Sequence, residues 1–180
     1  MATGIVSNKT AAYYGPDSYL YPSENSYVGP SEKVTILWKE STWCYIEYFV
    51  GSTVTKKRMY IPYSALSNIN GTISTKSLLG TTKTSSSTTT YAGPGSEPEY
   101  AKAGTVGVES VIAYNEISGD YTFIQYNVSG DKKKRAYILT RMLSDSSATS
   151  NIIKDPINPS INYTNGNHKD YGVSTGTPLY

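Results

Sequence analysis

The chain has 180 residues, of which 17% are charged and 38% are apolar, so a hydrophobic core can form but cannot be large. Its 16 basic and 14 acidic residues leave a net charge of +2, whereas proteins that bind a nucleic-acid backbone usually have a strongly basic face. The sequence contains no apolar run long enough for a membrane-spanning helix, and residues 1–6 lack the features of a secretory signal peptide. We therefore expect neither a nucleic-acid nor a membrane partner, and either an unusual export route or an excerpt of a longer chain.

Tyrosine is the unusual component, with 18 Tyr against 2 Phe. A tyrosine ring combines an apolar face with a polar tip, which suits half-buried strands and hydrated binding surfaces. Strand formation alone would explain part of this excess. Cys44 is the only cysteine, so no intramolecular disulfide can form, and we predict that it is a small buried apolar residue. The only histidine, His168, is far away in the sequence, which argues against a Cys/His nucleophile.

The first third of the chain has the pattern of a small β-structure. An edge strand is predicted at residues 4–7, and the Gly-Pro-rich, tyrosine-rich stretch 11–31 predicts a long loop. Strands are expected at 34–38 and 43–50, the second with apolar residues at period two. A hairpin loop at 51–55 leads into a third strand ending at Ile61, and a 3₁₀ turn should follow at 62–66.

The same plan returns later in the chain. Residues 56–67 (KKRMYIPYSALS) recur as residues 133–144 (KKRAYILTRMLS), with seven of twelve positions identical at an offset of 77. An internal repeat of this kind determines the domain organisation. We predict a first module at 1–67, a Ser/Thr-rich linker at 68–90, a second module at 88–144 and an irregular tail at 145–180. The short strands and frequent turn signals predict an all-β fold of two tandem small barrels.

The repeated residues resemble the bacterial SH3-like (SH3b) repeat. The resemblance covers both copies, about two-thirds of the chain. In order, it consists of a Gly-Pro turn with nearby Tyr, then Glu32-x-Val34, Trp43-x-x-Ile-x-Tyr48, a hairpin containing glycine, and Lys-Arg-x-Tyr60-Ile61. The resemblance implies two SH3-like β-barrels that bind bacterial cell wall as the targeting part of a peptidoglycan hydrolase or endolysin. It also implies an extracellular or cell-wall location, peptidoglycan or its stem peptides as the partner, and a monomer of host or phage origin.

Aromatic rings could stack on wall sugars, and basic side chains could pair with stem-peptide carboxylates through charge-assisted hydrogen bonds. An alternative role for Trp43 and Tyr121 is core packing, and the basic hairpins could be simply solvated. The candidate ligand-binding residues are Tyr13, Tyr14, Tyr19, Tyr21, Trp43, Tyr91, Tyr100, Tyr121, Lys57, Arg58, Lys134 and Arg135.

The end of the tail resembles the start of an M23 (LytM-like) zinc endopeptidase domain, through Asp170-Tyr-Gly-Val and residues 176–180 (GTPLY). By this resemblance His168 and Asp170 are candidate metal ligands, in His-x-Asp spacing where the family has three intervening residues. A catalytic zinc needs three protein ligands and an open position. The chain as given is therefore expected to be non-catalytic and to need no cofactor, with zinc belonging to a parent enzyme. A disordered tail is the alternative.

The sequence is compatible with three functions. The first is a non-catalytic tandem that binds peptidoglycan, in which two weak sites on one chain would raise avidity for a polymer. The second is a protein–protein interaction or structural module of a phage tail or cell-surface assembly. The third is single-strand nucleic-acid binding, which small barrels with aromatic and basic residues can perform, but which the near-neutral charge disfavours.

Overall fold

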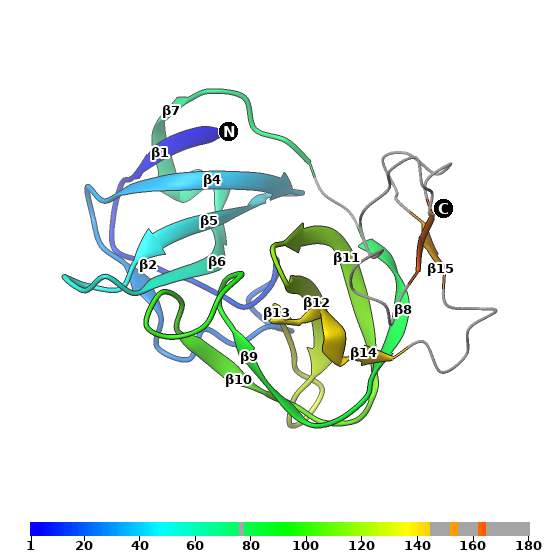
Figure 1. The fold of residues 1–180 in the computed structure, drawn as a ribbon. Coiled ribbons are helices and arrows are strands. Elements are labelled where there is room, and N and C mark those ends of the chain that lie inside the picture. Colours follow the sequence, from blue (N-terminus) through cyan, green and yellow to red (C-terminus); the bar gives the residue numbers. More distant parts are fainter. Residues whose placement is uncertain (76–77, 145–151, 155–161, 165–180) are drawn as a thin grey trace. The chain divides into compact units, whose positions relative to one another are not determined.

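The structure is a computed structural model, and it describes residues 1–75, 78–144, 152–154 and 162–164 (Figure 1). In these ranges the chain consists of β-strands, turns and two short 3₁₀ helices. The all-β prediction is confirmed, while closure of the strands into SH3-like barrels stays a prediction. No helix in the described ranges is both long and apolar enough to cross a bilayer.

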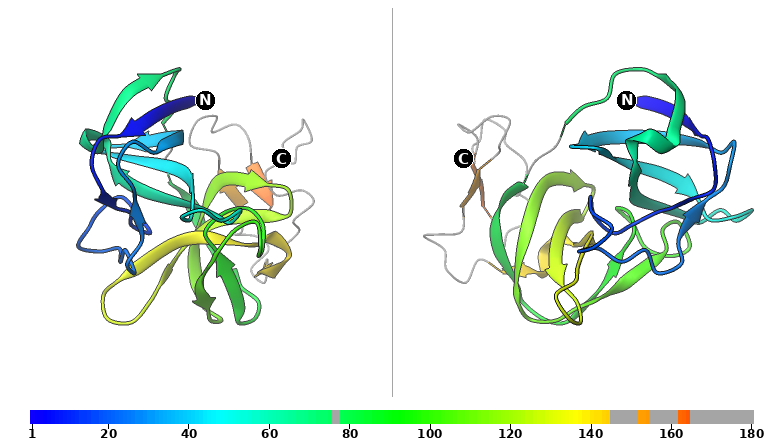
Figure 2. Two further views of the ribbon diagram at one scale, coloured as in Figure 1. Left: turned by 90° about the vertical axis from the view of Figure 1, so that its left-hand side faces the viewer. Right: turned by 180° about the vertical axis from the view of Figure 1, so that it is seen from behind.

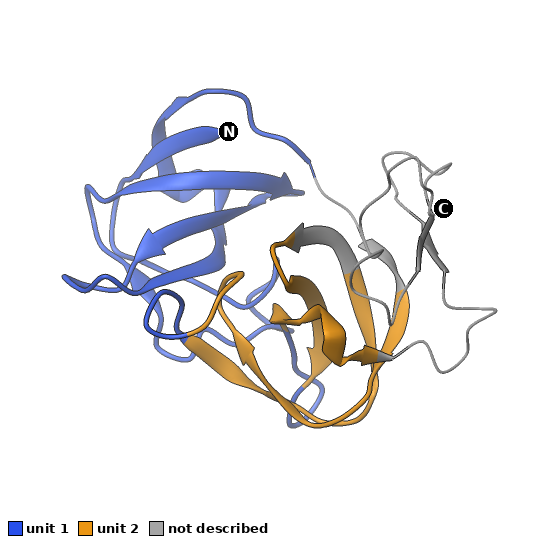
Figure 3. Ribbon diagram, viewed as in Figure 1, with its two compact units in different colours: residues 1–76, 97–101, 128–134 blue, residues 77–96, 102–127, 135–180 orange. Residues whose placement is uncertain are grey.

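The chain forms two compact units, coloured blue and orange in Figure 3. Unit 1 comprises Met1–Lys76, Glu97–Ala101 and Val128–Lys134. Unit 2 comprises Ser77–Ser96, Lys102–Asn127 and Arg135–Tyr180. Two short segments of the second sequence copy therefore belong to unit 1, which differs from a division at the predicted linker.

Unit 1 is built on a five-stranded antiparallel sheet in the order β6-β5-β4-β1-β7. These strands lie side by side in all the views of Figures 1 and 2. Their bounds are Ala2–Val6 (β1), Lys33–Glu40 (β4), Trp43–Phe49 (β5), Lys56–Pro62 (β6) and Leu66–Asn70 (β7). A separate two-stranded pair joins β2 (Thr10–Ala11) to β3 (Tyr27–Val28).

The strands of unit 1 form because apolar residues alternate with polar ones along them. In β4 the side chains of Val34, Ile36 and Trp38 are buried and those between them are more exposed, as a period of two requires. Aromatic rings fill the interior: the centroids of Tyr45 and Tyr60 lie 4.7 Å apart. The Trp38 indole N–H also donates a hydrogen bond to the Tyr60 hydroxyl at 3.3 Å. Tyr60 thus serves as a core residue with a hydrogen-bonded hydroxyl group.

Unit 2 contains most of a seven-stranded sheet in the order β10-β9-β13-β12-β11-β8-β14. The bounds are Leu78–Thr84 (β8), Thr88–Tyr91 (β9), Lys102–Val106 (β10), Ser110–Ser118 (β11), Tyr121–Asn127 (β12), Lys133–Leu139 (β13) and Leu143–Ser144 (β14). Its fully buried large side chains include Phe123, Ile124, Tyr126 and Tyr137. A short pair joins β15 (Ile152–Lys154) to β16 (Asn162–Thr164).

The internal repeat appears in the structure as the same strand–turn–strand–strand–3₁₀ sequence in each unit. In unit 1 the 3₁₀ helix η1 (Tyr63–Ala65) begins with the Tyr63 N–H donating to the Thr42 carbonyl at 2.8 Å. In unit 2 the 3₁₀ helix η2 (Thr140–Met142) begins with the Thr140 N–H donating to the Asp120 carbonyl at 2.7 Å. The predicted 3₁₀ turn after the third strand is confirmed.

The stretch 68–90, which the sequence predicted as a linker, instead contributes strands. It contains the end of β7, all of β8 and most of β9. Strand β8 pairs with both β11 and β14, and Thr82 and Thr84 on it are buried. The polarity of a threonine tract predicts a flexible linker. Threonine also favours β-strands, however, when a neighbouring strand pairs with its backbone.

Candidate ligand-binding site

Two of the predicted aromatic residues, Tyr13 and Trp43, form an edge-to-face pair in unit 1. Trp43 begins β5, and Tyr13 is held beside the sheet by reciprocal backbone hydrogen bonds with Tyr60, at 2.8 and 2.9 Å. The ring centroids are 5.5 Å apart and the ring planes meet at 84°. Such a pair contributes about 0.5–1.5 kcal/mol beyond area burial. Both rings are half-buried, so each is still partly open to a ligand.

The corresponding pair in unit 2 is Tyr91 and Tyr121. Tyr121 begins β12 as Trp43 begins β5, and Tyr91 pairs with Tyr137 as Tyr13 pairs with Tyr60. The ring centroids lie 6.2 Å apart at 87°, and both rings are again half-buried. Both copies of the repeat thus have the same edge-to-face arrangement of two aromatic rings. Trp43 of unit 1 is replaced by Tyr121 in unit 2.

A cleft of about 320 Å³ lies on unit 1 next to the pair formed by Tyr13 and Trp43. Trp43 forms one wall, and Tyr63 of η1, 39% exposed, forms another. The Lys39 ammonium lies over the Tyr63 ring, 5.1 Å from its centroid. The cleft comes together because β5 and β6 pair in a register that sets Trp43 opposite Pro62, immediately before η1. Its lining residues are Lys39, Thr42, Trp43, Pro62, Tyr63 and Ser64.

Sequence reasoning selected Trp43 for this site but did not select Lys39 or Tyr63. The sequence did contain information that could have placed Tyr63 in this site. Tyr63 lies in the predicted 3₁₀ turn just after the third strand, and pairing that strand with 43–50 as a hairpin would have placed the two aromatics near each other. Lys39 lies between two predicted strands and outside the repeated basic motif, so nothing in the local pattern distinguished it.

Four of the predicted ligand-binding residues are buried in unit 1 and are part of its interior. They are Tyr14, Tyr21, Tyr100 and Lys134. The Lys134 ammonium pairs with the Glu24 carboxylate at 2.5 Å and lies over the Tyr14 ring, 4.6 Å from its centroid. The Tyr14 and Tyr21 rings are buried because the long loop folds back onto the sheet, where sequence analysis expected an open aromatic surface. Tyr100 comes from segment 97–101 and is buried beside Glu47.

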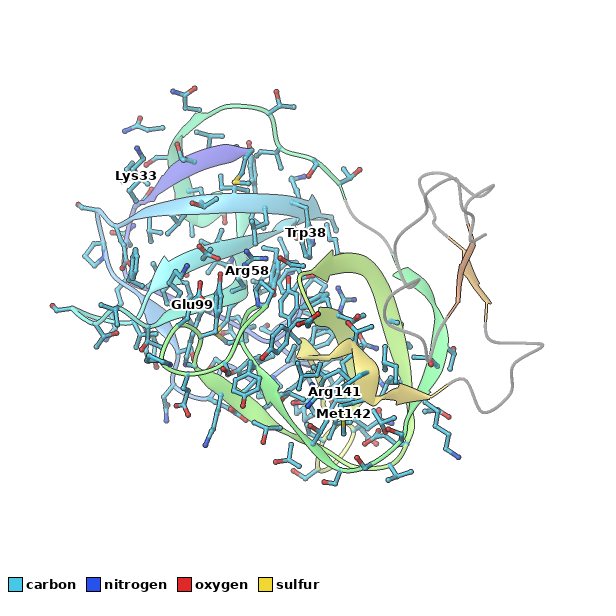
Figure 4. The ribbon with its side chains drawn as sticks, viewed as in Figure 1. Lys33, Trp38, Arg58, Glu99, Arg141 and Met142 are labelled. Atoms are coloured by element: carbon cyan, nitrogen blue, oxygen red, sulfur yellow. The ribbon has the colours of Figure 1, made fainter. Side chains whose placement is uncertain are left out.

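Tyr100 belongs to a charged cluster around Glu47 in unit 1. The Glu47 carboxylate accepts hydrogen bonds from the Tyr100 hydroxyl at 2.7 Å and from Arg58 Nε at 2.8 Å. Lys56 approaches the same carboxylate at 3.8 Å and Glu99 at 3.4 Å. Figure 4 labels Arg58 and Glu99 within this cluster. Arg58 is therefore engaged by the fold itself.

The remaining predicted basic residues also have partners inside their own unit. Lys57 donates to the Ser26 hydroxyl at 2.9 Å, and burial together with the Lys134 charge lowers the pKa of Lys57. In unit 2, Arg135 Nε donates to the Gln125 side-chain oxygen at 3.0 Å.

Tyr19 is the most exposed predicted aromatic, at 76%, and the Lys132 ammonium lies over its ring.

The predicted metal ligands, His168 and Asp170, lie outside the described residues. Within the described ranges, no three His, Cys, Asp or Glu side chains come together as a metal site. Cys44 is buried, as predicted, and burial raises the pKa of its thiol to about 11, against a smaller opposing effect of Lys39. A thiol of this kind is almost fully protonated at neutral pH and is a poor nucleophile.

The chain matches no protein-family model, no curated protein and no solved structure.

Proposed function

We propose that this chain is a non-catalytic module that binds bacterial peptidoglycan, and that the unit 1 cleft is its principal contact with the wall. The observation that carries the proposal is the cleft itself, in which exposed faces of Trp43 and Tyr63 stand beside the hydroxyls of Thr42 and Ser64. Aromatic faces accept the apolar faces of sugars and peptide stems, and hydroxyls pair with their polar edges. A volume of about 320 Å³ is at the lower end of the range for small-ligand sites, which suits a single sugar or short peptide.

The repeated ring pair supports a polymeric ligand. Tyr91 and Tyr121 give unit 2 a second pair of half-buried rings in the same arrangement as Tyr13 and Trp43. Two weak contacts on one chain raise the overall affinity only when the ligand offers many copies of the same feature. A cell wall does this and a small metabolite does not. We further propose that the two units are SH3b-like modules that target a peptidoglycan hydrolase to the wall. In this proposal the hydrolysis is catalysed by an M23-type domain of the parent enzyme, and the protein acts outside the cell.

Sedimentation of the fluorescently labelled chain with purified Gram-positive sacculi tests the proposal. The intact chain is expected to co-sediment in a saturable way. Tyr63→Ala removes one wall of the cleft and is expected to weaken binding about tenfold, which corresponds to about 1.4 kcal/mol. Because Tyr63 is partly exposed, we expect this variant to fold, and its thermal unfolding should be measured alongside.

Tyr27→Ala is the matched control, since Tyr27 is a 50% exposed tyrosine of unit 1 that does not line the cleft. Its binding should stay within about twofold of the intact chain. Failure of the intact chain to co-sediment would overturn the proposal. Equal losses in Tyr63→Ala and Tyr27→Ala would show that the cleft is not the contact.

A further inference from the structure

The cleft of unit 1 contains a cation whose charge no described carboxylate neutralises. Lys39 is half-buried on β4, and its ammonium lies over the Tyr63 ring at 5.1 Å. Lys39 takes no part in the ion pairs that join Lys56, Arg58 and Lys134 to carboxylates in the described part of unit 1. An ammonium without a carboxylate partner beside an aromatic wall favours an anionic occupant, because opposite charges attract each other more strongly at a partly buried site than in bulk water.

The backbone holds Lys39 firmly at this position. Its N–H donates to the Ser74 carbonyl at 2.8 Å, and it pairs with Cys44 in the β4–β5 register. Its side chain therefore starts from a fixed point on the sheet, next to the strand that carries Trp43. A charge on a rigid strand is a more selective recognition element than a charge on a loose loop.

Comparison of the two copies shows that the fold does not need this cation. The position that matches Lys39 in unit 2 is Ile117, since Lys39 pairs with Cys44 as Ile117 pairs with Thr122. The position that matches Tyr63 is Thr140, which is buried and shares a hydrogen bond with Thr122 at 2.5 Å. Unit 2 thus builds the same strands, turn and ring pair with an uncharged residue at the position of Lys39.

We propose that Lys39 makes the unit 1 cleft selective for a ligand with a free carboxylate, and that the two units differ in what they recognise. In this arrangement the ligand carboxylate pairs with the Lys39 ammonium through a charge-assisted hydrogen bond, while its adjoining apolar part rests on Trp43 and Tyr63. The ring pair of unit 2 makes contacts that are independent of ligand charge. The inference rests on the proposed wall-binding function, in which the carboxylate belongs to a stem peptide and its amidated form is the poorer ligand.

Isothermal titration of the intact chain with two synthetic muropeptides tests this inference. The two probes are identical except that one ends in a free carboxylate and the other in a carboxamide. We expect the carboxylate form to bind about fivefold to tenfold more tightly at low salt, with the difference shrinking as salt is added. Lys39→Gln should bind both probes equally, and Lys39→Arg should restore the preference, since it keeps the charge.

Lys33→Gln is the matched control for net charge. Lys33 is an exposed lysine at the opposite end of β4 from Trp38, as the labels in Figure 4 show, and it does not line the cleft. This variant should keep the full preference for the carboxylate. Loss of the preference in Lys33→Gln as well would overturn the inference in favour of a general charge effect.

The outcomes separate this inference from the proposed function. Equal binding of both probes by the intact chain, with sacculi still bound, would overturn the role of Lys39 and leave wall binding standing. An absence of binding to either probe and to sacculi would overturn both. Equally tight binding of a short oligonucleotide would also overturn the inference, because it would show a site for any anion.

Discussion

At the residue scale, Glu47 shows how a half-buried charge is kept in a small fold. Burial alone would raise the pKa of this carboxyl group, because burial disfavours the charged form. Hydrogen bonds from Tyr100 and Arg58 and the positive charges of Arg58 and Lys56 outweigh burial and lower the pKa below its ordinary value of 4.5. The ionised carboxylate is therefore the form that the fold stabilises.

This lowered pKa predicts a pH dependence of stability. A carboxyl group with a lowered folded-state pKa stabilises the fold above its ordinary pKa of 4.5, and this contribution is lost as the pH falls through the folded-state value. The free energy of unfolding of Glu47→Gln should therefore lie below that of the intact chain by about 1–2 kcal/mol at pH 7. The gap should narrow as the pH falls toward about 3.

Urea unfolding followed by tryptophan fluorescence would measure this gap. The chain has two tryptophans, Trp38 and Trp43, and both lie in unit 1 with Glu47, so the signal reports the correct unit. Asp131→Asn, which removes an exposed carboxylate of the same unit, serves as the control and should show little change. A gap for Glu47→Gln that stays constant between pH 7 and pH 3 would contradict the prediction.

At the element scale, the aromatic loop of unit 1 is closed by a tight contact at Gly15. Hydrogen bonds brace the loop: the Asp17 carboxylate accepts from the N–H groups of Tyr19 and Leu20, and the Tyr14 N–H donates to the Pro22 carbonyl. The Tyr21 ring folds over Gly15 so closely that a Cβ added there would lie 2.1 Å from a ring carbon. The glycine is required because only a residue without a side chain leaves room for the buried ring.

Gly15→Ala should accordingly destabilise unit 1 by about 1–3 kcal/mol, because the Tyr21 ring must leave its place or the loop must shift. Gly29→Ala is the matched control in the same unit, since its added Cβ would meet its nearest neighbour at an ordinary 3.7 Å. Thermal unfolding of the two variants and the intact chain would measure the difference. Equal melting temperatures for the two variants would show that the loop is not closed in this way.

At the scale of the whole molecule, unit 1 depends on chain segments that follow it by many residues. Segment 97–101 bonds to β6 through the Lys56 N–H to the Glu99 carbonyl at 2.8 Å, and it carries Tyr100 to Glu47. Segment 128–134 bonds to the loop through the Lys133 N–H to the Leu20 carbonyl at 2.9 Å, and it carries Lys134 to Glu24. Both segments belong to the second copy in sequence and to unit 1 in space.

A fragment ending at residue 76 should therefore be less stable than unit 1 within the full chain. It lacks several backbone and charged hydrogen bonds, and we expect a loss of at least about 3 kcal/mol. Urea unfolding followed by tryptophan fluorescence compares the two, with a chain ending at residue 144 as the control, because it retains all three segments of unit 1. An unchanged midpoint for the 76-residue fragment would show that the first copy is self-sufficient.

Local sequence pattern was sufficient to predict much of the architecture. Alternation along β4 and β5 and the 3₁₀ turn at Tyr63–Ala65 follow from neighbours in sequence. The repeat at an offset of 77 predicted that the second copy would build the same elements, and it does so in η2. Period-two burial and turn chemistry act over a few residues, which is why the chain alone reveals them.

Long-range packing decided which aromatic residues are exposed and which residues share a site. The sequence identified Trp43 as a candidate ligand-binding ring, but its neighbours Lys39 and Tyr63 come from a different strand and from η1, and only the pairing register brings them together. Nothing in the local sequence distinguishes Tyr14, Tyr21 and Tyr100 from exposed rings, yet all three are buried in unit 1. The burial of a ring depends on what distant segment covers it, and a period of two residues carries no information about that segment.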